Sequence, residues 1–250
     1  MGKDSERIRA YLRDQLHRNR ELREAASLGE GPQRMAHALR EWQVRRLRQT
    51  FADLTDNPGY SQATAFFLDD LYSVEGFESR DDELEKIVPI MMRLLPAHLV
   101  QTVGKAMELQ ALSQELDIKL AQILQDNHVA PGEISVADYT QAYIESGLRQ
   151  EREHQIDLIC DVGHELNSVV DKPFIYGALK LCRRPARAAG LGDLQTFLER
   201  GFQAYRSMAD PDWFIHQIEL RERHILDRLM NAYPDPFNIS AVIESSPDGQ

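Results

Sequence analysis

The run FFLDDLY, residues Phe66–Tyr72, is the densest apolar and aromatic stretch in the first half of the chain, and it carries two adjacent carboxylates. On a helix, Asp70 shares a face with Phe66 and Phe67, because side chains three and four positions apart are neighbours there. Asp69 points to the side. An unpaired buried charge is costly. We therefore expect Asp70 to be a structural buried carboxylate that pairs with an arginine and ties this helix to the basic segment before it.

The motif Phe-Phe-x-x-Asp-Leu-Tyr is followed by a charged turn and by a segment that ends at Leu94-Leu95-Pro96. This combination resembles an uncharacterised bacterial all-helical family, a domain of unknown function. The resemblance implies an all-helical fold and no particular activity.

Charge is distributed unevenly along the chain of 250 residues. The net charge is −11, yet residues 1–50 hold 12 Lys and Arg against 7 Asp and Glu. The acidic remainder argues against general nucleic-acid binding, which depends on neutralising phosphates. The basic N-terminal segment can dock on an acidic surface, either of a partner or of the rest of the same protein.

The cysteines and the apolar runs bear on the compartment. Cys160 and Cys182 have no second cysteine or histidine at the spacing of a zinc site, so we expect two free, buried thiols in a reducing compartment. The N-terminus lacks the apolar core of a signal peptide. No apolar run approaches the roughly 20 residues that span a bilayer. We therefore expect a cytoplasmic protein.

Apolar residues recur at helical spacing along most of the chain, and no useful length of sequence alternates as a strand does. The fold class predicted is all-α, a bundle of about eight or nine helices with no significant sheet. The helix from residue 135 is expected to reach 170 unless Gly147 or Gly163 bends it. The expected helices are 5–26, 33–54, 61 onward through the opening motif, 79–95, 97–126, 135–170, 173–189, 194–205 and 211–230.

Local end signals support several of these boundaries. Ser135 and Asp138 form the pattern of a capping box, in which each residue satisfies a backbone donor of the other. Asp210 precedes Pro211, a capping residue followed by proline at the first helical position. Gly201 is expected to allow a neighbouring element to approach closely.

Three regions are predicted from these breaks. Residues 1–55 form a basic N-terminal helical pair that packs on the main body, and residues 56–232 form the main helical bundle. Residues 233–250 contain three prolines and are expected to be an extended, partly disordered tail.

A polar stripe on the helix after residue 135 has the composition of a metal site. Glu151 and His154 show the Glu-x-x-His spacing by which di-iron bundles direct two ligands at one metal. His154, Asp157, Asp161 and His164 lie within an arc of about 80° on a helical wheel. The expected apolar face lies roughly opposite and consists of Ile144, Leu148, Ile159, Val162 and Leu166. This geometry predicts that the stripe faces water.

Carboxylates on apolar faces are a second kind of candidate. Glu151 borders the apolar face of its helix, and Glu222 falls among the apolar residues of the last helix, as Asp70 does in the opening motif. Such groups could converge as acid–base groups or as ligands. The favoured alternative is structural pairing, for which the candidate partners are Arg45, Arg46, Arg48 and Arg221.

Sequence patterns of common enzymes are missing: there is no Gly-x-Ser-x-Gly elbow, Walker loop or dinucleotide-binding fingerprint. The leading hypothesis is a non-catalytic cytoplasmic helical protein that binds a protein partner or itself, without a cofactor. The alternative is a helical carboxylate and histidine metalloenzyme, di-iron or heme-oxygenase-like, whose iron is held by Glu151 and His154 together with Glu222 or His216. A third hypothesis is RNA or nucleotide binding by the first helix, through Arg7, Arg9, Arg13, Arg18, Arg20 and Arg23.

Overall fold

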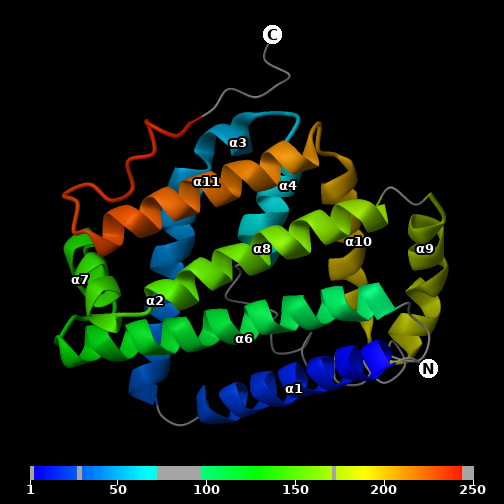
Figure 1. The fold of residues 1–250 in the computed structure, drawn as a ribbon, viewed down its shortest axis with the longest axis horizontal. Helices are drawn as coiled ribbons and strands as arrows, with labels where there is room; N and C mark the ends of the chain where they lie inside the picture. The colour runs from blue at the N-terminus through cyan, green and yellow to red at the C-terminus, as the bar shows by residue number, and fades with distance from the viewer. Residues whose placement is uncertain (1–2, 27–29, 72–96, 171–172, 244–250) are drawn as a thin grey trace.

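The computed structural model describes residues 3–26, 30–71, 97–170 and 173–243, and over these ranges every regular element is a helix (Figure 1). Eight of the described helices have seven or more residues, so the predicted all-α fold is confirmed. The predicted helix 79–95 lies outside the described residues. The elements are α1 (Lys3–Ala26), α2 (Glu30–Thr50), α3 (Ala52–Asp56), α4 (Ser61–Phe66), the π-helix η1 (Phe67–Leu71), α6 (Ala97–Asp126), α7 (Val136–Ser146), α8 (Arg149–Val170), α9 (Pro173–Ala188), α10 (Gly192–Arg206) and α11 (Pro211–Met230).

Helix α6 lies at the middle of the arrangement. Figure 1 shows α1 along one side of α6, α8 along the other, and α11 beyond α8, while α2 crosses behind this layer. The α9–α10 hairpin lies at one end, where α9 packs on α10 and meets the end of α8.

The main core joins residues of five helices, α2, α6, α7, α8 and α11. Leu39 of α2, Leu120 of α6 and Tyr139 of α7 are fully buried, and Ile225 of α11 is nearly so. Trp42 of α2 stacks on Tyr139 with ring centroids 4.2 Å apart. Burying such large apolar side chains is the main favourable contribution to folding. Helices α1 and α2 therefore both pack on later elements, α1 against α6 and α2 within this core.

The opening motif continues α4 into the π-helix η1 and lies between α2 and α10. Phe67 is buried and meets the ring of Phe51 edge-on at 5.9 Å. Phe66 contacts α10, where a Cβ added to Gly201 would lie 2.8 Å from the ring, so the expected close approach at Gly201 is confirmed. Asp69 accepts from Arg48 of α2 at 2.9 Å. The Asp70 side chain lies outside the described residues, and its anchoring role stays a prediction.

The predicted helix 135–170 is two helices. The capping box of Ser135 and Asp138 is confirmed at the start of α7. Gly147 ends α7 in the left-handed conformation, with φ of 64°, which glycine adopts without strain. The apolar face predicted across this break is wrong at Ile144 and Leu166, which are exposed, whereas Leu148 and Ile159 pack against core residues. In α8 the buried positions are Arg152, Ile156, Leu158, Cys160 and Val170.

The segment after α11 folds back over the core. Residues 233–243 form turns rather than an extended chain, because Phe237 packs its ring against Trp42 at 5.7 Å and Tyr139 at 6.1 Å. Arg228 donates to the carbonyl of Asp235, which closes the turn. Residues 244–250 lie outside the described residues.

In the part of the chain that the structure describes, none of the helices has the combination of length and apolar character needed to cross a bilayer.

Candidate functional site

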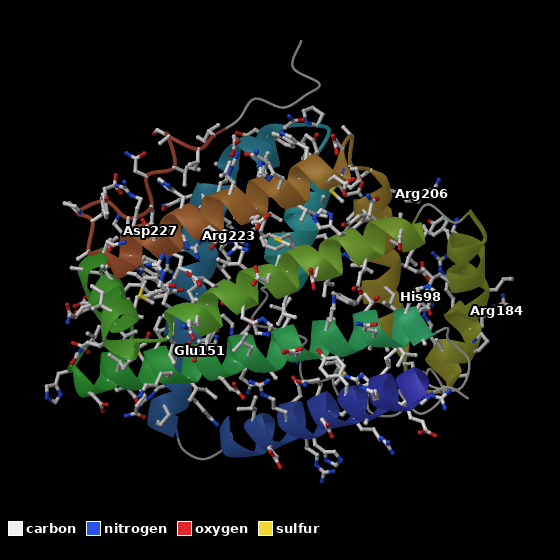
Figure 2. The ribbon with its side chains drawn as sticks, viewed as in Figure 1. His98, Glu151, Arg184, Arg206, Arg223 and Asp227 are labelled. Carbon is white, nitrogen blue, oxygen red and sulfur yellow. The ribbon has the colours of Figure 1, made fainter. Side chains whose placement is uncertain are left out.

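The four residues proposed as iron ligands do not share one environment. Glu151 is exposed in the first turn of α8 (Figure 2), so its expected place on a buried face is wrong. His154 meets Glu108 of α6 at 3.0 Å, whereas Glu222 accepts from Arg46 of α2 at 2.6 Å. His216 is exposed on α11. The described residues contain no group of three or more His, Cys, Asp or Glu side chains placed to hold a metal ion.

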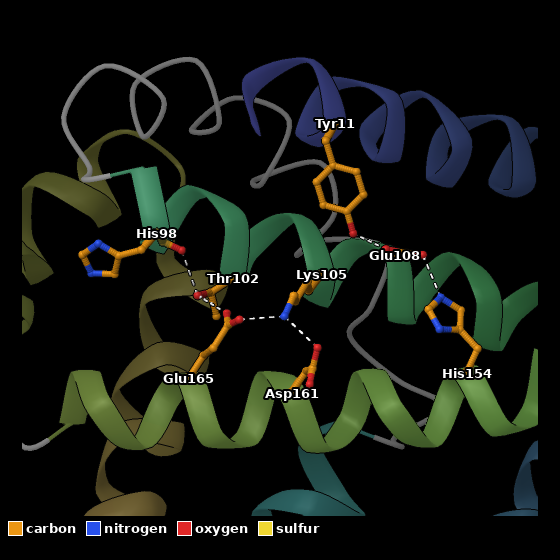
Figure 3. Close-up of polar contacts among 8 residues, drawn as sticks. All are labelled: Tyr11, His98, Thr102, Lys105, Glu108, His154, Asp161 and Glu165. Atoms are coloured by element: carbon orange, nitrogen blue, oxygen red, sulfur yellow. Dashed lines mark hydrogen bonds and ion pairs between the residues drawn. The ribbon is translucent and has the colours of Figure 1, made fainter. Parts of the chain in front are cut away.

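The polar stripe of α8 lies on its exposed side, as the helical wheel predicts, but it also pairs with both neighbouring helices. His154 and Asp161 meet α6 through Glu108 and Lys105 (Figure 3). The other two stripe residues meet α11, in the pairs Asp157–Arg223 and His164–Asp212. The stripe therefore forms an alternating seam that joins α8 to α6 and to α11.

The α6 side of this seam consists of two separate groups of polar contacts, one around Lys105 and one around Glu108 (Figure 3). Lys105 bridges Asp161 and Glu165, each at 2.7 Å. Tyr11 of α1 donates to Glu108. Burial alone would raise the pKa of Glu108, but the hydrogen bonds from Tyr11 and His154 outweigh it and hold the pKa below its usual value. These contacts link α1, α6 and α8.

Two buried arginines, Arg46 and Arg221, pair with carboxylates. Arg46 and Glu222 form an ion pair whose side chains are 10% and 16% exposed. The fully buried Arg221 donates to both oxygens of Asp53 at 2.7 Å. Glu222 thus follows the pairing alternative, with one of the arginines proposed for it.

The arginines of α1 have mixed surroundings. Arg18 donates to Glu115 of α6, with its Nε 2.7 Å from Oε1, while Arg7 and Arg13 are exposed. At least one residue of the proposed RNA-binding set therefore serves the packing of α1 on α6.

The α9–α10 hairpin is strongly basic. Residues 173–206 hold six Lys and Arg against two Asp and Glu, in a chain whose net charge is −11. All four cations of α9 fall between residues 180 and 187, and α9 has no acidic residue. Such a concentration of one sign on a body of the opposite sign attracts anionic partners over several ångströms.

A cavity of about 300 Å³ opens between α9 and α10. Glu199 forms part of its wall and is 8% exposed. Arg183 Nε lies 2.6 Å from one oxygen of Glu199, and Gln195 Nε2 lies 2.8 Å from the same oxygen. These bonds, that from Arg183 above all, lower the pKa of Glu199 to about 2. At neutral pH this carboxylate is therefore charged, and Arg183 is its ion-pair partner. The cavity is lined by Arg183, Arg187, Gln195, Thr196, Glu199, Arg200 and Gln203.

Aromatic packing holds the two helices of the hairpin together. Tyr176 of α9 stacks on Phe202 of α10, with centroids 5.2 Å apart and planes 6° from parallel. Gln203 donates to the Tyr176 hydroxyl at 2.9 Å, and Lys180 lies over the Tyr176 ring at 4.2 Å. The two helices that carry the arginines of the cavity are therefore held against each other by these contacts.

The outer side of α9 presents an apolar residue among cations. Leu181 is 81% exposed, the largest exposed fraction among the large hydrophobic residues described. Lys180 and Arg184, next to it and three positions on, are also exposed. Figure 2 places Arg184 on this outer side of α9 and Arg206 near the end of α10.

This arrangement is suited to binding carboxylates. An arginine presents a planar fork of donors that matches a carboxylate in two parallel hydrogen bonds. Arg187 and Arg200 add two cations to a cavity in which the charge of Glu199 is matched by Arg183. A volume of about 300 Å³ is at the lower end of the range for ligand pockets, so the cavity has room for an acidic side chain.

Sequence reasoning missed this site, although a local signal exists. Residues 173–192 contain four Lys and Arg and no Asp or Glu. The net charge of the second half of the chain is negative, so the basic run 173–192 is not visible in it.

Comparison with known proteins identifies a family. The model of the family described as Domain of unknown function (DUF8198) matches residues 22–236, and the chain belongs to that family. The expectation of a family without an assigned function is therefore confirmed. Neither the curated proteins nor the solved structures include a significant match to the chain. The matched residues contain the whole α9–α10 hairpin.

Proposed function

We propose that this member of the DUF8198 family is a non-catalytic binding protein that captures an acidic segment of a protein partner on its α9–α10 hairpin. The arginine-lined cavity of about 300 Å³ carries the proposal, because it joins donors for carboxylates to a basic surface. Arg187 and Arg200 bind acidic side chains in the cavity. Leu181, exposed between cations, contacts an apolar residue of the same partner.

The charge distribution supports a partner with acidic residues. Charge complementarity steers encounter and rejects partners of the wrong sign. The hairpin is, after residues 1–50, a second basic part of an acidic protein, so an acidic segment is attracted to it and repelled by the acidic surfaces. The proposal includes a cytoplasmic setting, where the buried thiol of Cys160 stays free.

The test is a binding titration with a fluorescein-labelled peptide of Asp and Glu residues that contains one Leu, followed by fluorescence anisotropy. The double variant Arg187→Gln/Arg200→Gln is expected to bind at least about tenfold more weakly than the wild type, a loss of about 1.4 kcal/mol or more. A peptide with Asn and Gln in place of the acids is expected not to bind.

The matched control is Arg7→Gln/Arg13→Gln, which removes the same charge from exposed positions of α1. It is expected to bind like the wild type. Equal weakening in both double variants would mean that only net charge matters and would refute a site on the hairpin. Binding is also expected to weaken as salt rises, because exposed charges are screened.

Self-association is the other form of protein binding that the hairpin permits, since a second copy offers an acidic body. Light scattering of the wild type and of the Arg187→Gln/Arg200→Gln variant separates the two. A wild-type dimer that the variant loses would identify the partner as a second copy. A monomer that also fails to bind the acidic peptide would remove the support for the proposal.

A further inference from the structure

A second, smaller cavity, partly open to solvent, lies where α2, α7, α8 and α11 meet. Its volume is about 30 Å³. Its apolar wall is formed by α11 and by Ile156 of α8, and its polar wall by Arg46, Tyr143, Arg152, Gln155 and Glu222. It is separate from the cavity of the α9–α10 hairpin, with which it shares no lining residue.

Arg46 brings an unused donor to this cavity. Its side chain is 10% exposed, and its Nη1 donates to Glu222 at 2.6 Å. Its Nε is buried and has no hydrogen-bond acceptor. A buried donor without an acceptor is costly, and a ligand bound in the cavity that Arg46 lines can supply that acceptor.

Arg152 brings a second guanidinium to the same cavity. It is 5% exposed, donates to Gln155 at 3.1 Å, and lies over the ring of Tyr143 at 4.7 Å. The polar wall therefore presents two guanidinium groups and one carboxylate. The carboxylate of Glu222 is already engaged by Arg46 Nη1.

We propose that this cavity binds a single halide ion, chloride under ordinary conditions, which accepts from Arg46 Nε beside the Arg152 guanidinium. Size favours a small ligand, because an accessible volume of about 30 Å³ has room for one monatomic ion or for one or two water molecules. Charge then decides between the two occupants, since hydrogen bonds from cations are strongest to an anionic acceptor. The bound halide ties α2 to α8 at the centre of the core.

The first test measures the melting temperature while chloride replaces gluconate at constant ionic strength. Gluconate is far too large for a cavity of about 30 Å³. A ligand that binds only the folded state raises the melting temperature with its concentration. The expected rise is roughly 3–6 °C when chloride reaches ten times its dissociation constant. Arg46→Gln and Arg152→Gln are expected to lose this response, and Arg45→Gln, an exposed neighbour on α2, is expected to keep it.

The second test uses the wild-type protein alone and so does not depend on the folding of a variant. Chloride exchanging with a protein site broadens the ³⁵Cl NMR line, and bromide is expected to remove that broadening by competing for the cavity. Equal melting temperatures in chloride and gluconate, together with no broadening that bromide displaces, would overturn the proposal and assign the cavity to water. Where the two tests disagree, the displaceable broadening decides.

Discussion

The ion pair between Arg221 and Asp53 gives the sharpest stability prediction. Arg221 is fully buried, and besides its two bonds to Asp53 it donates to the carbonyl of Thr50 at 3.0 Å and lies over Phe51. The Asp53 side chain is 44% exposed. The two partners therefore depend on each other unequally, because water can solvate Asp53 but cannot easily reach Arg221.

Replacing Asp53 with Asn should therefore be costly. The variant keeps the size of the side chain but leaves a buried cation without its anion, and breaking a buried pair in this way costs about 3–5 kcal/mol. We expect about 3 kcal/mol, the lower end of that range, because the exposed side of Asp53 admits some water. For a chain of this length the melting temperature is expected to fall by roughly 6–12 °C.

A double-mutant cycle tests the reasoning. Arg221→Met removes the buried charge itself, so Asp53→Asn in the Arg221→Met background is expected to cost less than about 1 kcal/mol. The assay is urea unfolding followed by circular dichroism, with Asp56→Asn as a control in the same short helix. Asp56 is exposed, and its replacement is expected to change little. A loss below about 1 kcal/mol for Asp53→Asn alone, or simple additivity in the double variant, would refute the argument.

Three further predictions concern packing, a thiol and acid stability. Gly201→Ala is expected to destabilise the protein by roughly 1–3 kcal/mol in urea unfolding, because the new Cβ would lie 2.8 Å from Phe66. The control Gly177→Ala, which has nothing within 4 Å of its new Cβ, should instead stabilise the protein by up to about 1 kcal/mol. A more stable Gly201→Ala variant than Gly177→Ala would contradict the packing. In a Cys182→Ser background, Cys160 should resist iodoacetamide at pH 8 until denaturant is added, because burial raises the pKa of its thiol to about 12; labelling at the rate of a free cysteine would show that the thiol is accessible. Arg183 lowers the pKa of Glu199 from 4.5 to about 2, so the stability that ionised Glu199 contributes is present above pH 4.5 and is lost as the pH falls from 4.5 toward 2. The difference in melting temperature between the wild type and Glu199→Gln should therefore narrow over that interval. A difference that stays constant would contradict the pairing with Arg183.

Helix positions are largely predictable from this sequence, because their signals are local. The expected helix 97–126 matches α6, and the expected helix 211–230 matches α11. The capping box at Ser135 and the Asp210–Pro211 start both form as predicted. Each depends on residues within one turn, so distant packing does not alter them.

Helix faces are less predictable, because they depend on where a helix breaks. An apolar face that is extended from Ile144 across Gly147 does not continue along α8, because the left-handed turn at Gly147 removes the fixed phase between α7 and α8. As a result Glu151 is exposed while Arg152, the next residue, is buried. A buried arginine is hard to predict from local pattern, because its cost is offset by distant partners such as the ring of Tyr143.

The candidate site depends on tertiary structure in a similar way. The acid-free run 173–192 indicates a basic surface. It does not indicate that α10 supplies Glu199 to hold Arg183, or that the two helices leave a cavity between them. Both follow from the hairpin geometry, which brings side chains 16 residues apart into contact.

The most direct test of the account is to map binding of the acidic, Leu-containing peptide residue by residue, using backbone amide shifts in ¹H–¹⁵N NMR spectra of the wild-type protein. The account predicts that the largest shifts fall between residues 176 and 206, around Leu181, Arg187 and Arg200, and that they disappear in Arg187→Gln/Arg200→Gln. Shifts centred on α1 around Arg7 and Arg13, with the hairpin unchanged, would contradict it.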